Sequence, residues 1–395
     1  MLEESCGNDD KIDKIAGRLG YTARHLRRVF TEAYNVPPIR YRQTCRLLLA
    51  KSLLTDTDLP ILEIAMASGF GSLRRFNDLF KERYRLSPTA LRKRASAGEN
   101  PDGGITLALG YRPPYRWEAM LHFLSGRAIP GVETVKDGAY LRTAHFVTAA
   151  GKRIYGCLRV RDCPAKNTLS VTISENLLPV LSQVLACVKR LFDLHCDPIA
   201  VYETLSPMND LRPGLCVLGT RLPGCFDAFE MSVRAVLGQQ ITVKAARTLA
   251  ARIADAYGTR VQTGTDGLTH VFPSPENVLE LGASVKDRFG ELGVSSARSE
   301  TIGELARMFS QNEIDFHACP RPEEEIKKLT AIRGIGNRTA RYIAMRAIGW
   351  TDAFLETDAG VKKALQPLTS KEPLKRAEAW RPWRSYAVVN LWNAL

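Results

Sequence analysis

The chain has 395 residues, roughly two to three times the length of a usual domain, and 45% of them are hydrophobic and 25% charged. This composition excludes a mainly disordered, collagen-like or low-complexity chain, and no apolar run reaches the roughly 18 residues that a membrane span needs. The 55 basic residues outnumber the 42 acidic ones and leave a formal charge of +13, so we expect a polyanionic partner and no membrane association.

The nine cysteines are scattered, their number is odd, and no Cys-x-x-Cys pair occurs. In a long chain this pattern is typical of reduced thiols in the cytoplasm and not of a disulfide framework or a structural zinc site. A four-cysteine iron–sulfur loop near the C-terminus is also excluded, because no cysteine follows Cys319. We therefore expect a cytoplasmic protein without a metal and without a cofactor.

The most basic segment covers residues 1–95, where 18 basic side chains exceed 11 acidic ones by seven. Residues 96–104 are small, polar and rich in Gly and Pro, which predicts a flexible linker. Residues 1–95 contain a repeat with an offset of 49 to 50 positions. Ile15-Ala16, Gly20, Leu26, Phe30, Tyr34 and Pro38 recur as Ile64-Ala65, Gly69, Phe76, Phe80, Tyr84 and Pro88. Each copy predicts a short helix, a glycine turn and a second helix.

The second helix of each copy should begin after Thr22 or Ser72, because both side chains accept hydrogen bonds from a first helical turn. The apolar stripes consist of Leu26, Val29 and Phe30 in one copy and of Phe76, Leu79 and Phe80 in the other. The opposite faces carry Arg24, Arg27, Arg28, Arg74 and Arg75. Such a basic face suits a helix that lies in the major groove of DNA, and a plain helical bundle with solvated arginines is the alternative.

Two such motifs joined by a helix over residues 39–54, followed by Tyr84-Arg85-Leu86-Ser87-Pro88, resemble the AraC-type DNA-binding domain. The resemblance implies a promoter site in double-stranded DNA as a partner, and a role as a transcription activator in the bacterial cytosol. In the Ada branch of that family, a preceding domain with four zinc-binding cysteines accepts methyl groups. Only ten residues with one cysteine precede Lys11 here, so we expect no such activity from this chain.

The hydrophobic pattern changes from Ile105 onward. Leu169, Val171 and Ile173 alternate with polar residues as in a half-buried strand, and residues 177–194 predict an amphipathic helix. We expect an antiparallel sheet with helices on one face, and core packing for Trp117. The aromatic residues of 111–133 resemble the opening of the N-terminal domain of AlkA-type 3-methyladenine DNA glycosylases. That resemblance implies that Phe123 reaches the substrate pocket of the next domain.

A helical region is predicted to begin at Leu222-Pro223-Gly224 and to end before Gly238-Gln239-Gln240-Ile241. Further on, Gly334 and Gly336 lie between two predicted helices. They allow a tight turn whose backbone N–H groups suit a phosphate oxygen. Residues 327–350 carry six basic side chains and no acidic one, which is typical of a hairpin that holds the DNA backbone.

Asp358 stands 22 residues after Gly336 and shortly before a predicted helix. An isolated aspartate in this place is usually a helix cap. The hairpin, the continuation Thr339-Ala340-x-Tyr342 and the spacing resemble the helix–hairpin–helix glycosylase superfamily, and this resemblance implies that Asp358 is the catalytic carboxylate. Thr357 or Glu356 is then expected to cap the helix.

The closing residues 380–392 again resemble AlkA-type enzymes. The resemblance implies that Tyr342, Trp392 and Phe123 form a base pocket, and electron-rich rings suit a cationic alkylated base. Core packing is the alternative for these rings. Gln240 matches the wedge position that fills the gap of a flipped base, although an aliphatic residue can also occupy this position in the family.

The hairpin residues expected to bind DNA are Gly334, Gly336, Thr339 and Arg338. Members of the superfamily that also cut the DNA strand carry a lysine at the position of Arg338. A guanidinium stays protonated and cannot form a Schiff base, so we expect base hydrolysis that leaves an abasic site.

The sequence therefore predicts a mostly α protein with an α+β middle domain, expected to be a monomer. Its expected parts are an AraC-type DNA-binding domain (1–95), a linker (96–104), an AlkA-type N-terminal α+β domain (105–215) and an all-α helix–hairpin–helix glycosylase domain (216–395). The expected function is excision of alkylated bases from double-stranded DNA. The alternatives are a regulator without catalysis and a glycosylase for mismatched or oxidised bases.

Overall fold

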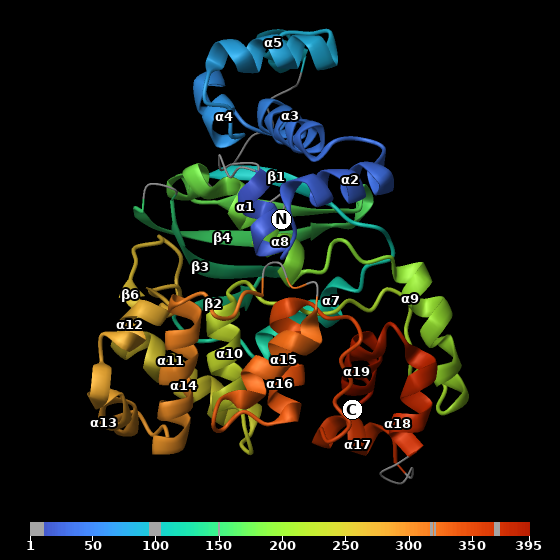
Figure 1. Cartoon of the computed structure of the whole chain (residues 1–395), viewed down its shortest axis with the longest axis vertical. Coiled ribbons are helices and arrows are strands. Elements are labelled where there is room, and N and C mark those ends of the chain that lie inside the picture. The colour runs from blue at the N-terminus through green and yellow to red at the C-terminus, as the bar shows by residue number, and fades with distance from the viewer. Residues whose placement is uncertain (1–11, 95–103, 149–150, 317–318, 320, 367–371) are drawn as a thin grey trace. The chain divides into compact units, whose positions relative to one another are not determined.

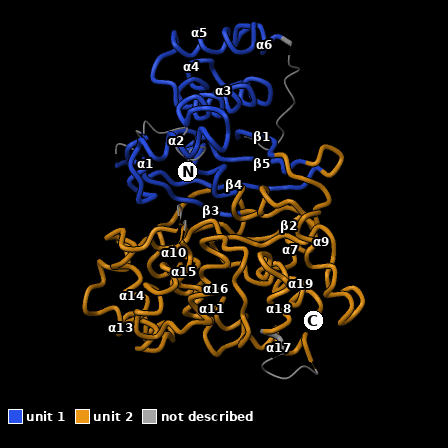
Figure 2. The backbone as a smooth tube through the Cα atoms, turned by 45° about the vertical axis from the view of Figure 1, so that its right-hand side comes forward, with its two compact units in different colours: residues 1–109, 142–163, 168–188 blue, residues 110–141, 164–167, 189–395 orange. Residues whose placement is uncertain are grey.

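The computed structural model describes residues 12–94, 104–148, 151–316, 319, 321–366 and 372–395. The chain divides into two compact units (Figure 2). Unit 1 comprises residues 1–109, 142–163 and 168–188, and unit 2 comprises residues 110–141, 164–167 and 189–395. The predicted linker over 96–104 lies, apart from Gly104, outside the described residues. Within the described ranges, no helix has the length and apolarity that crossing a bilayer requires.

The first helices of unit 1 form the two predicted copies (Figure 1). They are α1 (Ile12–Arg18), α2 (Ala23–Tyr34), α3 (Pro38–Asp56), α4 (Ile61–Ala67), α5 (Leu73–Tyr84) and α6 (Pro88–Arg94). Thr22 accepts a hydrogen bond from the N–H of His25 at 3.2 Å, and Ser72 accepts one from the N–H of Arg75 at 3.4 Å. Both predicted caps are therefore confirmed.

The two copies differ in how deeply their second helices are buried. Phe76 and Phe80 of α5 are fully buried, whereas α2 has no fully buried residue. Val29, a member of the predicted apolar stripe of α2, is 44% exposed. It lies one position before Phe30, at the edge of the face that packs, and the helix turns its side chain toward solvent.

A five-stranded sheet has the strand order β1-β5-β4-β3-β2. Its strands are β1 (Ile105–Gly110), β2 (Glu133–Lys136), β3 (Ala139–Val147), β4 (Arg153–Cys163) and β5 (Thr168–Ile173). β4 and β5 are antiparallel, with Leu158 opposite Ile173, and every second residue of β5 is buried as predicted. The helix predicted over 177–194 is instead a 3-10 helix η3 (Glu175–Val180) followed by α8 (Leu181–Leu191), because Pro179 lacks the N–H that a continuous α-helix needs.

Unit 2 is mainly helical (Figure 1). Its α-helices are α7 (Trp117–Ser125), α9 (Pro198–Leu205), α10 (Ala228–Leu237), α11 (Val243–Tyr257), α12 (Pro275–Leu279), α13 (Val285–Glu291), α14 (Ser296–Ser310), α15 (Pro322–Ala331), α16 (Asn337–Ile343), α17 (Ala359–Ala364), α18 (Glu372–Ala377) and α19 (Arg384–Asn393). Shorter elements are η2 (Pro164–Lys166), η4 (Ser206–Asp210), β6 (Thr259–Arg260), β7 (His270–Val271), η5 (Gly282–Ser284), the π-helix η6 (Ala344–Ile348) and η7 (Glu378–Trp380).

Two hydrophobic clusters occupy much of the interior of unit 2 among the described residues. One is built mainly from α10, α11, α14 and α16, and the other mainly from α9, α17 and α19. Tyr342 packs against both clusters, so this side chain marks the place where they meet. Trp117 on α7 is 6% exposed and donates a hydrogen bond from Nε1 to the carbonyl of Gly138 at 3.1 Å, which confirms its predicted core role.

The helix expected from Leu222 begins only at α10, where Asp227 accepts a hydrogen bond from the N–H of Glu230 at 2.7 Å. The preceding stretch is not helical, since the carbonyls of Pro223 and Gly224 accept hydrogen bonds from the guanidinium of Arg346. A side chain in the protein interior thus takes up carbonyls that a helix would have used.

Asp193 joins the start of that stretch to α19. Its Oδ2 accepts hydrogen bonds from the N–H of Leu222 and the hydroxyl of Tyr386, both at 2.9 Å. Burial raises the pKa of Asp193 to about 6, despite these bonds and the nearby Arg221. The folded protein therefore holds a proton on Asp193 up to about pH 6, while the unfolded chain releases it near pH 4.

The protonated carboxyl of Asp193 therefore contributes to the stability of the folded protein at low pH. This contribution to the free energy of unfolding is lost as the pH rises through 6. An asparagine at this position stays neutral and tolerates the left-handed backbone (φ 52°). We therefore expect the stability of Asp193→Asn relative to wild type to rise as the pH is raised from 4.5 to 7.5. The gain should be on the order of 1–3 kcal/mol in the free energy of unfolding, measured by urea denaturation.

Asp197 is the control for this pH effect. It caps α9, and hydrogen bonds to the N–H groups of Ala200 and Ile199, together with Arg112, lower its pKa. Asp197→Asn should therefore be less stable than wild type by an amount that stays constant over the same pH interval, because Asp197 is ionised in both the folded and the unfolded chain there. An equal response of both variants would contradict the assignment of Asp193.

Candidate active site

The predicted hairpin consists of α15, a turn and α16. Gly334 has a φ of 95°, a left-handed conformation that glycine adopts with little strain. A Cβ there would lie 2.3 Å from Oγ1 of Thr301 on α14, a hydroxyl that donates a hydrogen bond to the carbonyl of Arg333 at 2.8 Å. Gly336 is the N-cap of α16, and a Cβ there would meet open space. The turn is thus closed against α14 at Gly334 and open at Gly336.

The loop between α10 and α11 is fastened to this hairpin by Gln239. Its Nε2 donates hydrogen bonds to the carbonyl of Gly334 at 2.8 Å and to Oγ1 of Thr339 at 3.1 Å. The backbone carbonyl of Gln239 accepts a hydrogen bond from the guanidinium of Arg298. The next residue, Gln240, is exposed and has a left-handed φ of 54°. Gln239 therefore holds the loop, while the side chain of Gln240 points outward. The sequence pattern indicated only Gln240.

The basic side chains of residues 327–350 do not share one role. Arg338 and Arg341 form ion pairs with Asp358 and Glu356. Arg346 is 5% exposed and binds the two backbone carbonyls ahead of α10. The guanidinium of Arg346 is therefore bound in the protein interior and is not part of a basic surface of the hairpin.

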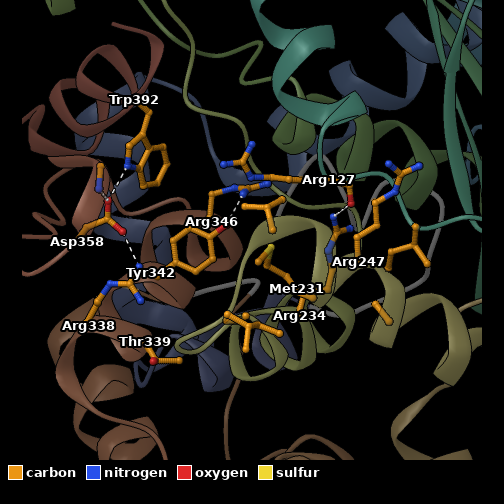
Figure 3. A pocket seen from close by; sticks show the side chains of 18 residues that line it. Arg127, Met231, Arg234, Arg247, Arg338, Thr339, Tyr342, Arg346, Asp358 and Trp392 are labelled. Carbon is orange, nitrogen blue, oxygen red and sulfur yellow. Dashed lines mark hydrogen bonds and ion pairs between the residues drawn. The ribbon is translucent and has the colours of Figure 1, made fainter. Parts of the chain in front are cut away.

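Asp358 lies at the start of α17 and is 7% exposed. Its Oδ1 accepts three hydrogen bonds, from the N–H groups of Gly360 (2.9 Å) and Val361 (3.1 Å) and from Nε1 of Trp392 (3.0 Å). Its Oδ2 pairs with Nη2 of Arg338 at 2.5 Å. Backbone, indole and guanidinium thus fix both carboxylate oxygens (Figure 3).

The expectation that Thr357 or Glu356 caps this helix is wrong, because Asp358 itself is the cap. Glu356 pairs with Arg341 at 2.6 Å instead. Burial raises the pKa of Asp358, but hydrogen bonds from Arg338, Trp392 and the backbone outweigh it and bring the pKa below its usual value. The carboxylate is therefore ionised at neutral pH.

Three aromatic rings from distant parts of the sequence meet beside this carboxylate. The ring of Trp392 lies 6.2 Å from that of Tyr342 at an edge-on angle of 66°, and 6.2 Å from that of Phe123 at 21°. Phe123 on α7 is 6% exposed, and the guanidinium of Arg127 stacks on it at 3.8 Å. The structure thus brings the three predicted rings together, with Phe123 behind Trp392.

Arginines surround Tyr342. Arg346 donates a hydrogen bond from Nη1 to the phenolic oxygen at 2.9 Å. Burial raises the pKa of Tyr342, but the positive charges of Arg346, Arg127 and Arg234 prevail and lower it. Burial in turn lowers the pKa of Arg127. The phenol therefore lies in a strongly positive environment.

Arg234 is held by two buried carboxylates, Glu133 at 2.7 Å and Glu230 at 3.0 Å, and it also binds the backbone carbonyl of Arg127. Sequence reasoning missed Arg127 and Arg234. The pair Glu230–Arg234, four residues apart within an otherwise apolar helix, was the available signal for Arg234. Arg127 had no comparable signal.

A pocket of about 330 Å³ opens among these side chains (Figure 3). Its lining contains five of the predicted site residues: Asp358, Tyr342, Trp392, Arg338 and Thr339. Arg127, Arg234, Arg247 and Arg346 also line it, so guanidinium groups supply most of its charge. Phe123, Gly334, Gly336 and Gln240 are not among the eighteen lining residues.

The predicted DNA-binding arginines of the first domain lie in unit 1, on α2 and α5. All five side chains are exposed: Arg24, Arg27, Arg28, Arg74 and Arg75. Arg28 pairs with Glu32 at 3.3 Å, and Arg27 approaches Asp13 at 3.8 Å. Exposed pairs of this kind are weak, which leaves these guanidinium groups able to exchange partners.

Three family models match consecutive parts of the chain. The helix-turn-helix domain model matches residues 15–94, the AlkA N-terminal domain model matches residues 106–227, and the HhH-GPD superfamily base excision DNA repair protein model matches residues 233–381. Asp358 and Tyr342 lie inside the third match, and Phe123 and Arg127 lie inside the second.

Two curated relatives are similar over most of the chain. A probable bifunctional transcriptional activator/DNA repair enzyme AlkA of Mycobacterium tuberculosis is 35% identical over 405 residues, which cover 100% of this chain and 79% of the relative. DNA-3-methyladenine glycosylase 2 of Escherichia coli is 37% identical over 284 residues, which cover 72% of this chain and 95% of the relative.

Among solved structures, a 3-methyladenine DNA-glycosylase from Archaeoglobus fulgidus superposes with a TM-score of 0.58 at 22% identity, over 72% of this chain and 96% of that one, and shares its fold. The family resemblances read from the sequence are therefore confirmed. The chain belongs to the AlkA family of helix–hairpin–helix base excision DNA repair proteins, with an AraC-type helix–turn–helix domain ahead of the repair domains.

Proposed function

We propose that this protein flips alkylated bases, 3-methyladenine first among them, out of double-stranded DNA and hydrolyses their N-glycosidic bonds. The observation that carries the proposal is the ionised carboxylate of Asp358, fixed by four hydrogen bonds in the lining of a pocket that also contains Tyr342 and Trp392. The names of the curated relatives support the same reaction and lesion.

In the proposed reaction, the bond between base and sugar breaks while positive charge develops on the sugar. The negative charge of Asp358 stabilises that charge and orients or deprotonates the attacking water. An N-alkylated purine is already cationic, so it leaves without protonation by a general acid. The low pKa of Asp358 keeps the carboxylate available for this role at neutral pH.

The remaining groups have roles in binding. The rings of Tyr342 and Trp392 offer faces on which the flipped base can stack, and Gln240 fills the gap left in the duplex. The turn at Gly334 and Gly336 and the exposed Arg338 hold the DNA backbone. The exposed arginines of α2 and α5 bind a promoter site, which gives the same chain a role as a transcription activator in the bacterial cytosol.

Incubation of the full chain with a duplex that carries 3-methyladenine and 7-methylguanine tests the proposal. Mass spectrometry of the released bases should find methylated purines, and the strand should break only after alkali treatment. Strand breaks without alkali would contradict simple hydrolysis. A second duplex carries 8-oxoguanine. Release of 8-oxoguanine without release of methylated purines would favour a glycosylase for oxidised bases, and no release from either duplex would favour a regulator without catalysis.

Gly360 provides a further test of the carboxylate geometry. A Cβ at this position would lie 2.9 Å from Cδ1 of Trp392 and 3.1 Å from Oδ1 of Asp358, so one of these groups has to shift in Gly360→Ala. We expect the single-turnover rate of base release to fall roughly tenfold, since misplacement by about 1 Å can cost about 100-fold.

Gly303→Ala is the matched control for Gly360→Ala, because the Cβ added at Gly303 of α14 would meet only an ordinary contact at 3.8 Å, with Cγ1 of Val285 on α13. Its rate should equal that of wild type. An unchanged rate in Gly360→Ala would show that the position of Trp392 against Asp358 does not matter for the reaction.

A further inference from the structure

The two oxygens of Asp358 are unequally engaged. Oδ1 accepts three hydrogen bonds and has no further lone pair to offer, whereas Oδ2 is held by Arg338. Oδ2 is therefore the oxygen left for a substrate. In the DNA-free protein, the guanidinium of Arg338 is bound to Oδ2, the oxygen that would have to face the sugar of the substrate (Figure 3).

This cation opposes the proposed reaction. Positive charge develops on the sugar next to Oδ2 in the transition state, and a guanidinium bound to the same oxygen repels it and neutralises the carboxylate. Arg338 therefore has to leave Asp358 before the N-glycosidic bond breaks, because the rate of base release is lower while it stays.

The structure allows Arg338 to leave. Its side chain is 46% exposed and starts in the first turn of α16, two residues after Gly336 of the hairpin. The carboxylate is buried, but the guanidinium reaches it from an exposed side chain, and a phosphate is a strong alternative partner for a guanidinium. Arg346, in contrast, is buried and bound to backbone carbonyls, so it cannot exchange.

We propose that Arg338 exchanges partners when DNA binds. It pairs with Oδ2 of Asp358 in the free protein and moves to a phosphate of the bound strand, which exposes the carboxylate only in the complex. This inference rests on the proposed function. Arg338 is thus a positioning residue: it keeps Asp358 in place and ionised until substrate is present.

Arg341 offers a matched control. It lies on the same helix, and it pairs with Glu356 at 2.6 Å, so it joins the same two segments without contacting Asp358. The other titratable side chains that line the pocket around Asp358 are Arg127, Arg234, Arg247, Tyr342 and Arg346, and its own helix carries Lys362 and Lys363. Both variants leave all of these groups unchanged.

The experiment compares Arg338→Gln with Arg341→Gln in the full chain. The first quantity measured is the pKa of Asp358 without DNA, by carbon NMR of labelled aspartate, with Asp358→Asn to assign the signal. The second is the salt dependence of binding to a duplex with a tetrahydrofuran abasic-site analogue. The third is the single-turnover rate on methylated DNA at saturating protein.

Arg338→Gln should raise the pKa of Asp358 and reduce the slope of log affinity against log salt by about one, since one phosphate contact is lost. Its affinity for DNA should fall by a larger factor than its single-turnover rate at saturating protein, because the guanidinium is absent from the carboxylate in the wild-type complex as well. Arg341→Gln should leave all three quantities unchanged.

An unchanged salt slope in Arg338→Gln, or a single-turnover rate that falls by a larger factor than the affinity for DNA, would show that Arg338 stays on Asp358 in the complex and would overturn the exchange. An equal slope change in Arg341→Gln would overturn it too, because the effect would then be one of net charge. If wild type releases no base, the proposed function fails, while the NMR and binding measurements still test the exchange.

Discussion

Replacement of Asp358 by asparagine is expected to lower the rate of base release by at least about 10³-fold, or about 4 kcal/mol of transition-state stabilisation. The amide has the same shape and keeps an oxygen for the N–H groups of Gly360 and Val361, so the cap of α17 is preserved. What disappears is the negative charge beside the sugar. The measurement is the single-turnover rate on methylated DNA.

Glu356→Gln is the control for Asp358→Asn. It removes a carboxylate two residues away that pairs with Arg341 and does not line the pocket, so the rate should stay close to wild type. The affinity of Asp358→Asn for DNA should equal or exceed that of wild type, since Arg338 loses its partner within the protein. A rate within about tenfold of wild type would mean that another group stabilises the sugar cation.

Gly334→Ala is expected to destabilise unit 2 by about 2–4 kcal/mol and to weaken DNA binding. Two costs add up: the left-handed φ of 95°, which strains any residue with a Cβ, and the approach of that Cβ to 2.3 Å from Oγ1 of Thr301. Thr301 cannot simply turn away, because its hydroxyl donates to the carbonyl of Arg333. Urea denaturation and fluorescence anisotropy with duplex DNA measure the two effects.

Gly336→Ala separates the strain at Gly334 from a general effect of the added methyl group. Gly336 has a φ of −87° and open space around it, so its change in stability should stay below about 1 kcal/mol. Thr301→Ala combined with Gly334→Ala should recover the part of the loss caused by the contact, but not the backbone strain. Equal losses in the two glycine variants would contradict this account of the turn.

The elements that the sequence could predict are those specified by local patterns. The helix starts at Thr22 and Ser72 follow from one side chain and the N–H three residues later, and β5 follows from strict alternation. The hairpin and the spacing from Gly336 to Asp358 likewise lie within one short stretch. Such signals do not depend on how the rest of the chain folds.

The parts of the site that could not be predicted depend on partners far apart in the sequence. Arg234 meets Glu133 across 101 positions, and Gln239 meets Thr339 across 100. A buried charge is acceptable only where its partner is present, and nothing near it in the sequence says which residue that is. The arginines that line the pocket could therefore be identified only from the structure.

Asp358 illustrates a different difficulty. From the sequence, a helix cap and a catalytic carboxylate are competing interpretations of one aspartate. In the structure the two interpretations are compatible, because capping uses Oδ1 while Oδ2 pairs with Arg338. The N–H groups of the first turn, which the cap satisfies, also help to keep the carboxylate charged.

The pocket is a composite of two segments that family models assign to different domains. Of its lining residues, Arg127 and Ile129 come from the segment matched by the AlkA N-terminal model, while Asp358 and Tyr342 come from the HhH-GPD match. A substitution in the AlkA N-terminal match can therefore alter the pocket as directly as one in the HhH-GPD match, whereas no residue of the helix–turn–helix match lines this pocket.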